Sequence, residues 1–195
     1  QRYNFTVRNT SNFFNDRMTL DLGFSYVIQK DQNMLSQGQY FNPIVPLYLF
    51  PRGEDFTPYR MYERYDEGRQ LMTQHWPYGE MGMAMQNPYW IINRNMFNND
   101  RDRYMANAGL KYKVFDWMDI SGRVRIDNAN TRHTKKLYAS TDAKFAQNKG
   151  YYGDRKDVDK QLYADFLVNI NKRFNDFDLT ANVGASIQDV SMDYV

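Results

Sequence analysis

The sequence predicts an all-β chain, a piece of a transmembrane antiparallel β-barrel with long extracellular loops. Three observations predict it: six segments alternate apolar with polar residues, short and long connections alternate between them, and aromatic residues gather at the short connections. A period of two places the apolar side chains of a strand on one face. A soluble β-sandwich alternates in the same way and is the competing architecture.

The first three expected strands cover residues 2–9, 17–30 and 104–114. Their apolar positions are the odd numbers from 3 to 7, then the even numbers from 18 to 28 and from 104 to 114. Polar residues and glycines occupy most positions between them, and Val27 is an exception on the polar face. Each segment therefore has one apolar and one polar face, and a helical period does not fit them.

The last three expected strands cover residues 118–127, 161–173 and 177–189, with Leu167 as an exception on a polar face. Runs of about 10 to 14 residues exceed the usual strand of a soluble sandwich, about 5 to 6 residues. Membrane barrels start at about eight strands, so six would have to be completed by others. Because the chain opens on an alternating run without Met, we expect it to be an internal piece of a longer chain.

The connections are of two kinds. Short turns at 10–16, 115–117 and 174–176 combine turn-forming residues with flanking aromatics, and long loops cover 31–103 and 128–160. Aromatic rings at one level are typical of a membrane interface, where the ring is buried while its edge stays near the headgroups. We therefore expect periplasmic short turns and extracellular long loops.

Composition excludes several classes of protein. The 195 residues carry 25 basic and 23 acidic side chains, a net charge of +2 that offers no electrostatic basis for binding nucleic acid. The chain has no cysteine, so it forms neither disulfides nor thiolate metal sites. A mean hydropathy of -0.78 without a long apolar run excludes a transmembrane helix but not a barrel, whose strands show only one face to lipid.

Motifs for chemistry are missing, so we expect no enzyme, no metal and no cofactor. His75 and His133 are isolated residues of the expected loops. The four glutamates could supply a glycosidase pair and three clustered aspartates could bind Ca²⁺, but we favour solvated loop charges for both. The glutamates are Glu54, Glu63, Glu67 and Glu80, and the aspartates are Asp154, Asp157 and Asp159.

The 31–103 loop is dense in apolar and aromatic residues that must be buried against something. Four of its rings could stack on a sugar, although we favour a loop core or a partner contact for them. Two arginines that follow the apolar runs could hold the loop by bidentate hydrogen bonds, or less readily contact a substrate. The rings are Tyr48, Phe50, Tyr89 and Trp90, and the arginines are Arg52 and Arg94.

Four segments in order, "NPIVPLYLFPRG", "NPYWIINRN", "DRYMANAGLKY" and "GRVRID", resemble the SusC/RagA-type TonB-dependent outer-membrane transporters. The resemblance covers essentially the whole chain. It implies a single-chain barrel of about 22 strands with a plugged lumen, in the outer membrane of a Gram-negative bacterium. The plug domain and the TonB-contacting segment of such proteins are not among these residues.

The resemblance also implies a function and partners. A SusD-like surface lipoprotein would cap the external face, and the TonB complex would energise import of oligomeric nutrients. Glycans are the expected cargo and peptides the alternative within the family. A passive porin or structural outer-membrane barrel is the alternative from another class.

Overall fold

The structure is a computed structural model that describes residues 1–33, 40–78 and 86–195. The chain divides into two compact units, which we describe separately. The sheet unit comprises Gln1–Gln29, Asp100–Thr131 and Lys156–Val195, and the loop unit comprises Lys30–Asn99 and Arg132–Arg155.

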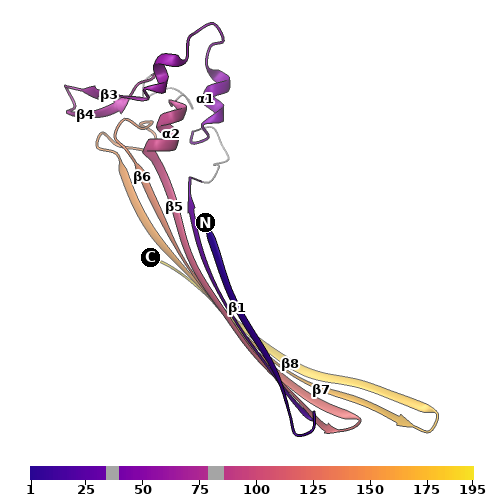
Figure 1. Ribbon diagram of the computed structural model, residues 1–195. Coiled ribbons are helices and arrows are strands. Elements are labelled where there is room, and N and C mark those ends of the chain that lie inside the picture. Colours follow the sequence, from indigo (N-terminus) through magenta and orange to yellow (C-terminus); the bar gives the residue numbers. More distant parts are fainter. Residues whose placement is uncertain (34–39, 79–85) are drawn as a thin grey trace. The chain divides into compact units, whose positions relative to one another are not determined.

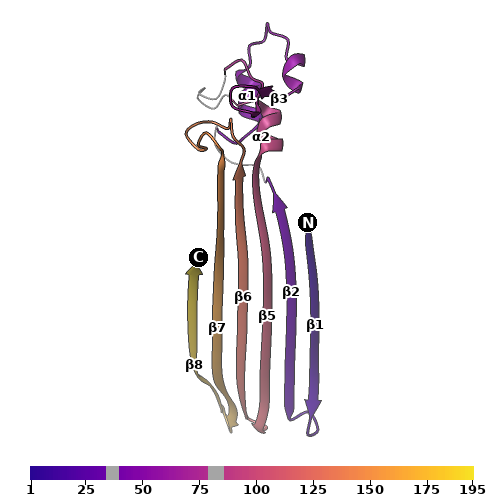
Figure 2. The same cartoon turned by 90° about the vertical axis from the view of Figure 1, so that its left-hand side faces the viewer.

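Six strands form one antiparallel sheet in the order β1-β2-β5-β6-β7-β8. Figure 2 shows them side by side in this order, with β1 and β8 as the outer strands. Consecutive strands are neighbours, and the turns β1–β2, β5–β6 and β7–β8 lie at the same end of the sheet. The strands are β1 (Arg2–Phe13), β2 (Met18–Gln32), β5 (Asn95–Phe115), β6 (Met118–Leu137), β7 (Tyr151–Phe174) and β8 (Phe177–Tyr194).

The register joins apolar positions to apolar positions. In β1 and β2, Phe5 pairs with Tyr26, and in β7 and β8, Val168 pairs with Val183. Because side chains alternate with a period of two, a pairing of this kind keeps the apolar face continuous from strand to strand. Leu167, the exception on a polar face, pairs with a glycine, Gly184, which has no side chain to oppose it.

All six expected strands are present, but several of their expected ends are wrong. Strand β1 extends into the expected turn 10–16 as far as Phe13, β2 continues to Gln32, and β8 continues to Tyr194. The expected loop 128–160 is largely strand, because β6 runs to Leu137 and β7 starts at Tyr151. The expected loop 31–103 ends earlier, since β5 begins at Asn95, and its residues 34–39 and 79–85 lie outside the described residues.

The extensions of β5, β6 and β7 are not evident in the sequence pattern because polar residues occupy most of their positions. Contacts between neighbouring strands stabilise them instead: Arg103 pairs with Asp127 and, in the loop unit, Arg132 pairs with Asp154. The backbone ladder of a strand forms whatever the side chains are, and opposite charges across strands add to it. An apolar alternation is therefore sufficient for a strand here but not necessary.

The loop unit contains short elements around a small core (Figure 1). They are α1 (Ile44–Leu49), the 3₁₀ helix η1 (Thr57–Arg60), the antiparallel pair β3 (Glu63–Asp66) and β4 (Leu71–Gln74), and α2 (Pro88–Arg94). Its buried apolar residues are Trp76, Trp90, Ile91, Leu137 and Ala146. Buried polar side chains complete the core, so its packing depends on hydrogen bonds as well as on apolar area.

The connection between β6 and β7 closes at Gly150, whose amide donates to the Gln147 carbonyl. Gly150 has a φ of +92°, and an added Cβ would lie 2.5 Å from the Leu137 carbonyl oxygen. Only glycine tolerates both conditions.

Candidate functional site

The sheet unit exposes its apolar face. Side chains that would form the core of a sandwich are half to two-thirds exposed: Phe166 51%, Val183 67% and Ile187 68%. Small residues at Ala106 and Ala108 leave a hollow of about 460 Å³ on this face, lined by larger apolar side chains of neighbouring strands. Contiguous exposed apolar area over six strands is rare on soluble proteins and marks an interaction surface.

Exposed aromatic side chains gather at the short-turn end of the sheet unit. Phe115 and Trp117 stack with ring centroids 5.1 Å apart, and the Lys172 ammonium lies 4.6 Å from the Trp117 ring centroid. Exposed phenylalanines occupy the other two turns: Phe13, Phe14, Phe174 and Phe177. This row of rings with an interleaved lysine has the composition of a membrane-interface belt.

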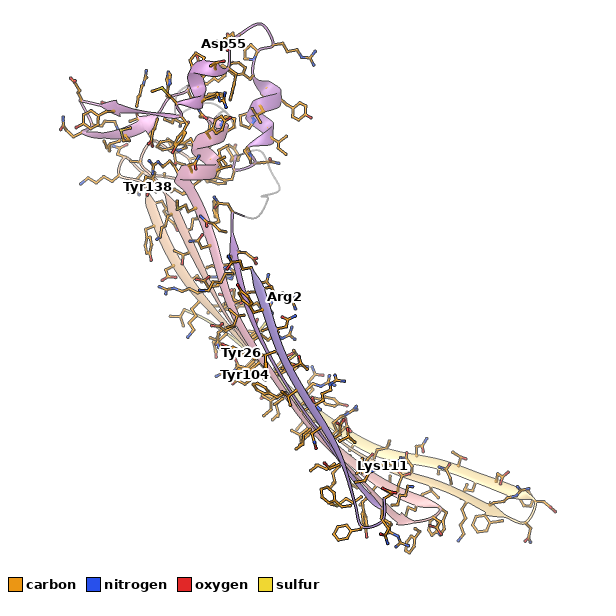
Figure 3. All side chains as sticks on the ribbon, viewed as in Figure 1. Arg2, Tyr26, Asp55, Tyr104, Lys111 and Tyr138 are labelled. Atoms are coloured by element: carbon orange, nitrogen blue, oxygen red, sulfur yellow. The ribbon has the colours of Figure 1, made fainter. Side chains whose placement is uncertain are left out.

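Polar contacts border the apolar face at the end of the strands away from the short turns. Tyr26 donates its hydroxyl to the Asp102 carboxylate (3.5 Å), and Tyr104 accepts from the Asn128 amide (2.9 Å). Tyr26 and Tyr104 lie on the same side of the sheet in Figure 3, with Arg2 and Lys111 on the other side. The apolar positions between these limits run from Met18 to Ile28, Tyr104 to Val114, Met118 to Ile126, Leu162 to Ile170 and Phe177 to Ile187.

The opposite face of the sheet unit carries cross-strand polar contacts. Lys111 contacts Asp119 (3.5 Å), and Arg123 contacts Asp165 (2.7 Å). Threonine, serine and asparagine side chains bridge further strand pairs, as in Thr6 with Ser25 at 3.0 Å. Several charges of this face therefore pair with one another across neighbouring strands.

The loop unit holds all six residues singled out as contact candidates. Trp90 is completely buried, and its indole N–H donates to the Thr141 hydroxyl (3.1 Å), which donates to the Asn95 side-chain oxygen (2.7 Å). A side chain without exposed surface cannot stack on a ligand. Trp90 is thus a core residue, as the loop-core interpretation predicted, and stacking on a sugar is wrong for it.

Arg94 holds the loop unit together by the bidentate contact that its position suggested. Its guanidinium donates to both carboxylate oxygens of Glu63 at 2.7 and 2.8 Å and lies 4.8 Å from the Tyr138 ring centroid. Desolvation is the largest single effect on the pKa of Arg94 and lowers it. The hydrogen bond to Glu63 and the charge of Glu63 together outweigh desolvation, so the pKa of Arg94 is raised. Arg94 is therefore occupied as a structural residue.

Phe50 and Tyr89 belong to a cluster of aromatic rings. The Phe50 centroid lies 5.1 Å from Phe56 and 5.5 Å from Trp76, and Phe56 lies 6.2 Å from Tyr89. Edge and tilted ring pairs of this kind connect the segments around α1, η1 and α2. Both residues are partly exposed, so part of each ring is accessible to a ligand.

Tyr48 and Arg52 are the exposed candidates. Tyr48 is 86% exposed on α1, beside the half-exposed Leu47 and Leu49, and Arg52 follows the helix. These residues remain available for a partner or a ligand.

The sequence pattern missed a groove in the loop unit. It encloses about 460 Å³ between the strands β5, β6 and β7 and is lined by Phe97, Asn99, His133, Thr134, Lys135, Tyr151, Gly153, Asp154 and Arg155. Most of these residues fall on odd positions of three strand extensions that lie within the expected loops. The signal in the sequence is the shared odd parity of these aromatic and basic residues, which is not an apolar alternation.

Both histidines and one aspartate of the strand extensions are engaged in structural contacts. His75 lies 3.1 Å from the Met61 carbonyl oxygen, and His133 lies 2.6 Å from the Asn99 side-chain oxygen. The pKa of Asp154 is lowered, chiefly because its carboxylate accepts hydrogen bonds from Arg132. Across residues 1–33, 40–78 and 86–195 no group of three or more His, Cys, Asp or Glu could hold a metal ion. Glu80 lies outside the described residues.

The fold and these surfaces define an all-β protein with a single-layer antiparallel sheet, one apolar face and one polar face. No helix in the described part of the chain is long and apolar enough to cross a membrane. Comparison of the chain with models of protein families and with curated proteins found no match.

Proposed function

We propose that the chain is part of an outer-membrane β-barrel that imports oligomeric nutrients, chiefly glycans, with a SusD-like lipoprotein and energy from the TonB complex. The observation that carries the membrane half of this proposal is the exposed apolar face, with aromatic rings at one limit and polar side chains at the other. Import proceeds without covalent change of the cargo.

The dimensions of the apolar face support lipid as its surroundings. The apolar runs, such as Met18 to Ile28 and Leu162 to Ile170, have the length of about 9 to 11 residues that a tilted strand needs to cross hydrocarbon. The outer strands β1 and β8 each have one unpaired edge, which lipid would not tolerate, so further strands must close the barrel. In a sandwich, a second sheet would cover the apolar face, and the other described sheet has only the short strands β3 and β4.

The transport half of the proposal rests on the resemblance of four segments to the SusC/RagA-type transporters. In such a barrel the polar face, with its paired charges, lines an aqueous lumen. The exposed Tyr48 and Arg52 then face the lipoprotein or the cargo. A peptide importer of the same kind and a passive porin are the alternatives.

Cysteine labelling tests the orientation of the two faces. Residues 1–195 contain no cysteine. Once any cysteines elsewhere in the full-length protein have been replaced, a single cysteine in β8 reports on its own position alone. In outer membranes, Val183→Cys should react with a lipid-soluble maleimide and resist a charged, water-soluble one, and Asn182→Cys should do the reverse, because successive side chains point to opposite faces. Equal labelling of both positions by both reagents contradicts the membrane assignment.

Uptake measurements test the transport class. Cells that express the full-length protein should accumulate a labelled oligosaccharide, and a protonophore that collapses the inner-membrane potential should abolish the accumulation. Uptake that persists without the potential indicates a porin. Energised uptake of labelled peptides but not of oligosaccharides indicates the peptide importer.

A further inference from the structure

We propose that the groove between β5, β6 and β7 is a binding site for a carboxylate-bearing sugar residue, such as a uronic acid. This inference rests on the proposed import of glycans and specifies which glycans the chain selects. It uses only residues of the loop unit.

Lys135 supplies the charge. Its ammonium lies 5.2 to 5.9 Å from the ring centroids of Tyr151, Phe41, Phe97 and Phe145. Cation–π contacts hold an ammonium in place, but they leave its charge uncompensated. No carboxylate of the described residues pairs with Lys135. A half-buried cation without an anionic partner, in the lining of a groove, favours an anionic ligand.

The other charged groups of the groove do not cancel this attraction. The one carboxylate in the lining, Asp154, accepts hydrogen bonds from Arg132 at 3.0 and 3.1 Å, so its charge is compensated. Arg155 is a second cationic residue of the lining, beside Lys135, and His133 is oriented by its 2.6 Å contact with the Asn99 side chain. The groove therefore carries a net positive charge.

Aromatic and amide side chains make the groove suitable for a sugar ring. Tyr151, 47% exposed, and Phe97 line the groove and offer flat apolar surfaces beside the ammonium. The apolar face of a pyranose packs on such rings, while Asn99 and Thr134 supply polar atoms for its hydroxyl groups. A sugar that carries a carboxylate matches both the rings and the charge. An acidic peptide matches only the charge.

Binding of a matched pair of probes tests the proposal. Tetragalacturonate and its methyl ester have the same sugar rings, and only the former is charged. Titration calorimetry of the full-length protein in detergent should show tetragalacturonate binding that Lys135→Met weakens at least about tenfold, the scale of one charge-assisted hydrogen bond. The methyl ester should bind weakly and equally to both proteins. Lys135→Arg should retain the affinity for tetragalacturonate.

Lys136→Met is the matched control, because Lys136 is the next residue of β6, is exposed and does not line the groove. It removes the same charge and should leave binding unchanged. The proposal is overturned if Lys135→Met and Lys136→Met have equal effects, if Lys135→Met weakens both probes equally, or if tetraglutamate binds more tightly than tetragalacturonate. Energised oligosaccharide uptake decides the proposed function independently: if uptake is seen and the groove variants bind normally, only the sugar-acid site is wrong.

Discussion

Val124→Arg is expected to destabilise the sheet in a bilayer by about 2 to 4 kcal/mol, the cost of an arginine at the lipid-facing midplane of a barrel. Val124 is 45% exposed on the apolar face, near the middle of the run from Met118 to Ile126. The substitution replaces an apolar side chain that is stable in hydrocarbon with a charged one that must be hydrated. The measurement is the denaturant midpoint of the full-length barrel refolded in lipid vesicles, together with its level in the outer membrane.

Asn107→Arg is the control on the opposite face. The Asn107 side chain lies over Gly23, where an added Cβ would meet its oxygen at 2.3 Å, so Gly23 leaves room above the polar face. An arginine at position 107 can extend into water there, and we expect the unfolding midpoint to stay close to that of the parent protein. Equal losses in the two variants would contradict the assignment of the faces.

Asn87→Ala is expected to destabilise the loop unit by about 3 kcal/mol or more, because it removes several buried hydrogen bonds together. The Asn87 side chain is fully buried; its amide donates to the Tyr59 and His75 carbonyls at 2.8 and 2.9 Å, and its oxygen accepts from the Tyr89 amide at 2.8 Å. Alanine leaves these groups without partners. Hydrogen exchange of the loop-unit amides, or limited proteolysis within residues 40–78, measures the loss.

Asn42→Ala is the matched control, since both asparagines precede a proline and make the same local contact. The Asn42 side-chain oxygen accepts from the Ile44 amide at 3.0 Å, two residues on, as Asn87 does with Tyr89. Asn42 is half-buried, but its hydrogen bond with the Ile44 amide is exposed, so water replaces the lost bond and we expect a loss below about 1 kcal/mol. Similar losses in both variants would show that the local turn, and not burial, makes Asn87 important.

The six long strands and the apolar face of each could be predicted because both follow from local alternation, whereas the short strands β3 and β4 lie within an expected loop. The extensions of β5, β6 and β7 could not, since residues such as Arg103 and Arg132 pair with aspartates of the neighbouring strand and carry no apolar period. Their strand conformation depends on a register that a single segment does not contain.

The candidate site was predicted less well, for a related reason. Tyr48 and Trp90 look alike in the sequence, as aromatic residues of a long loop, yet one is 86% exposed and the other is completely buried. The bidentate function of Arg94 was anticipated, but its partner Glu63 lies 31 residues earlier in the chain. The groove around Lys135 brings together segments that the sequence separates by more than fifty residues.

The amino-acid sequence by itself determined the period of the strands and the alternation of short and long connections. These depend on neighbours within a few residues, where backbone geometry and side-chain type suffice. Only the tertiary structure decided which of the asparagine, aromatic and lysine side chains are buried or paired. Burial and pairing depend on contacts between segments far apart in the chain, and the same residue type costs or contributes free energy according to the partners that it finds there.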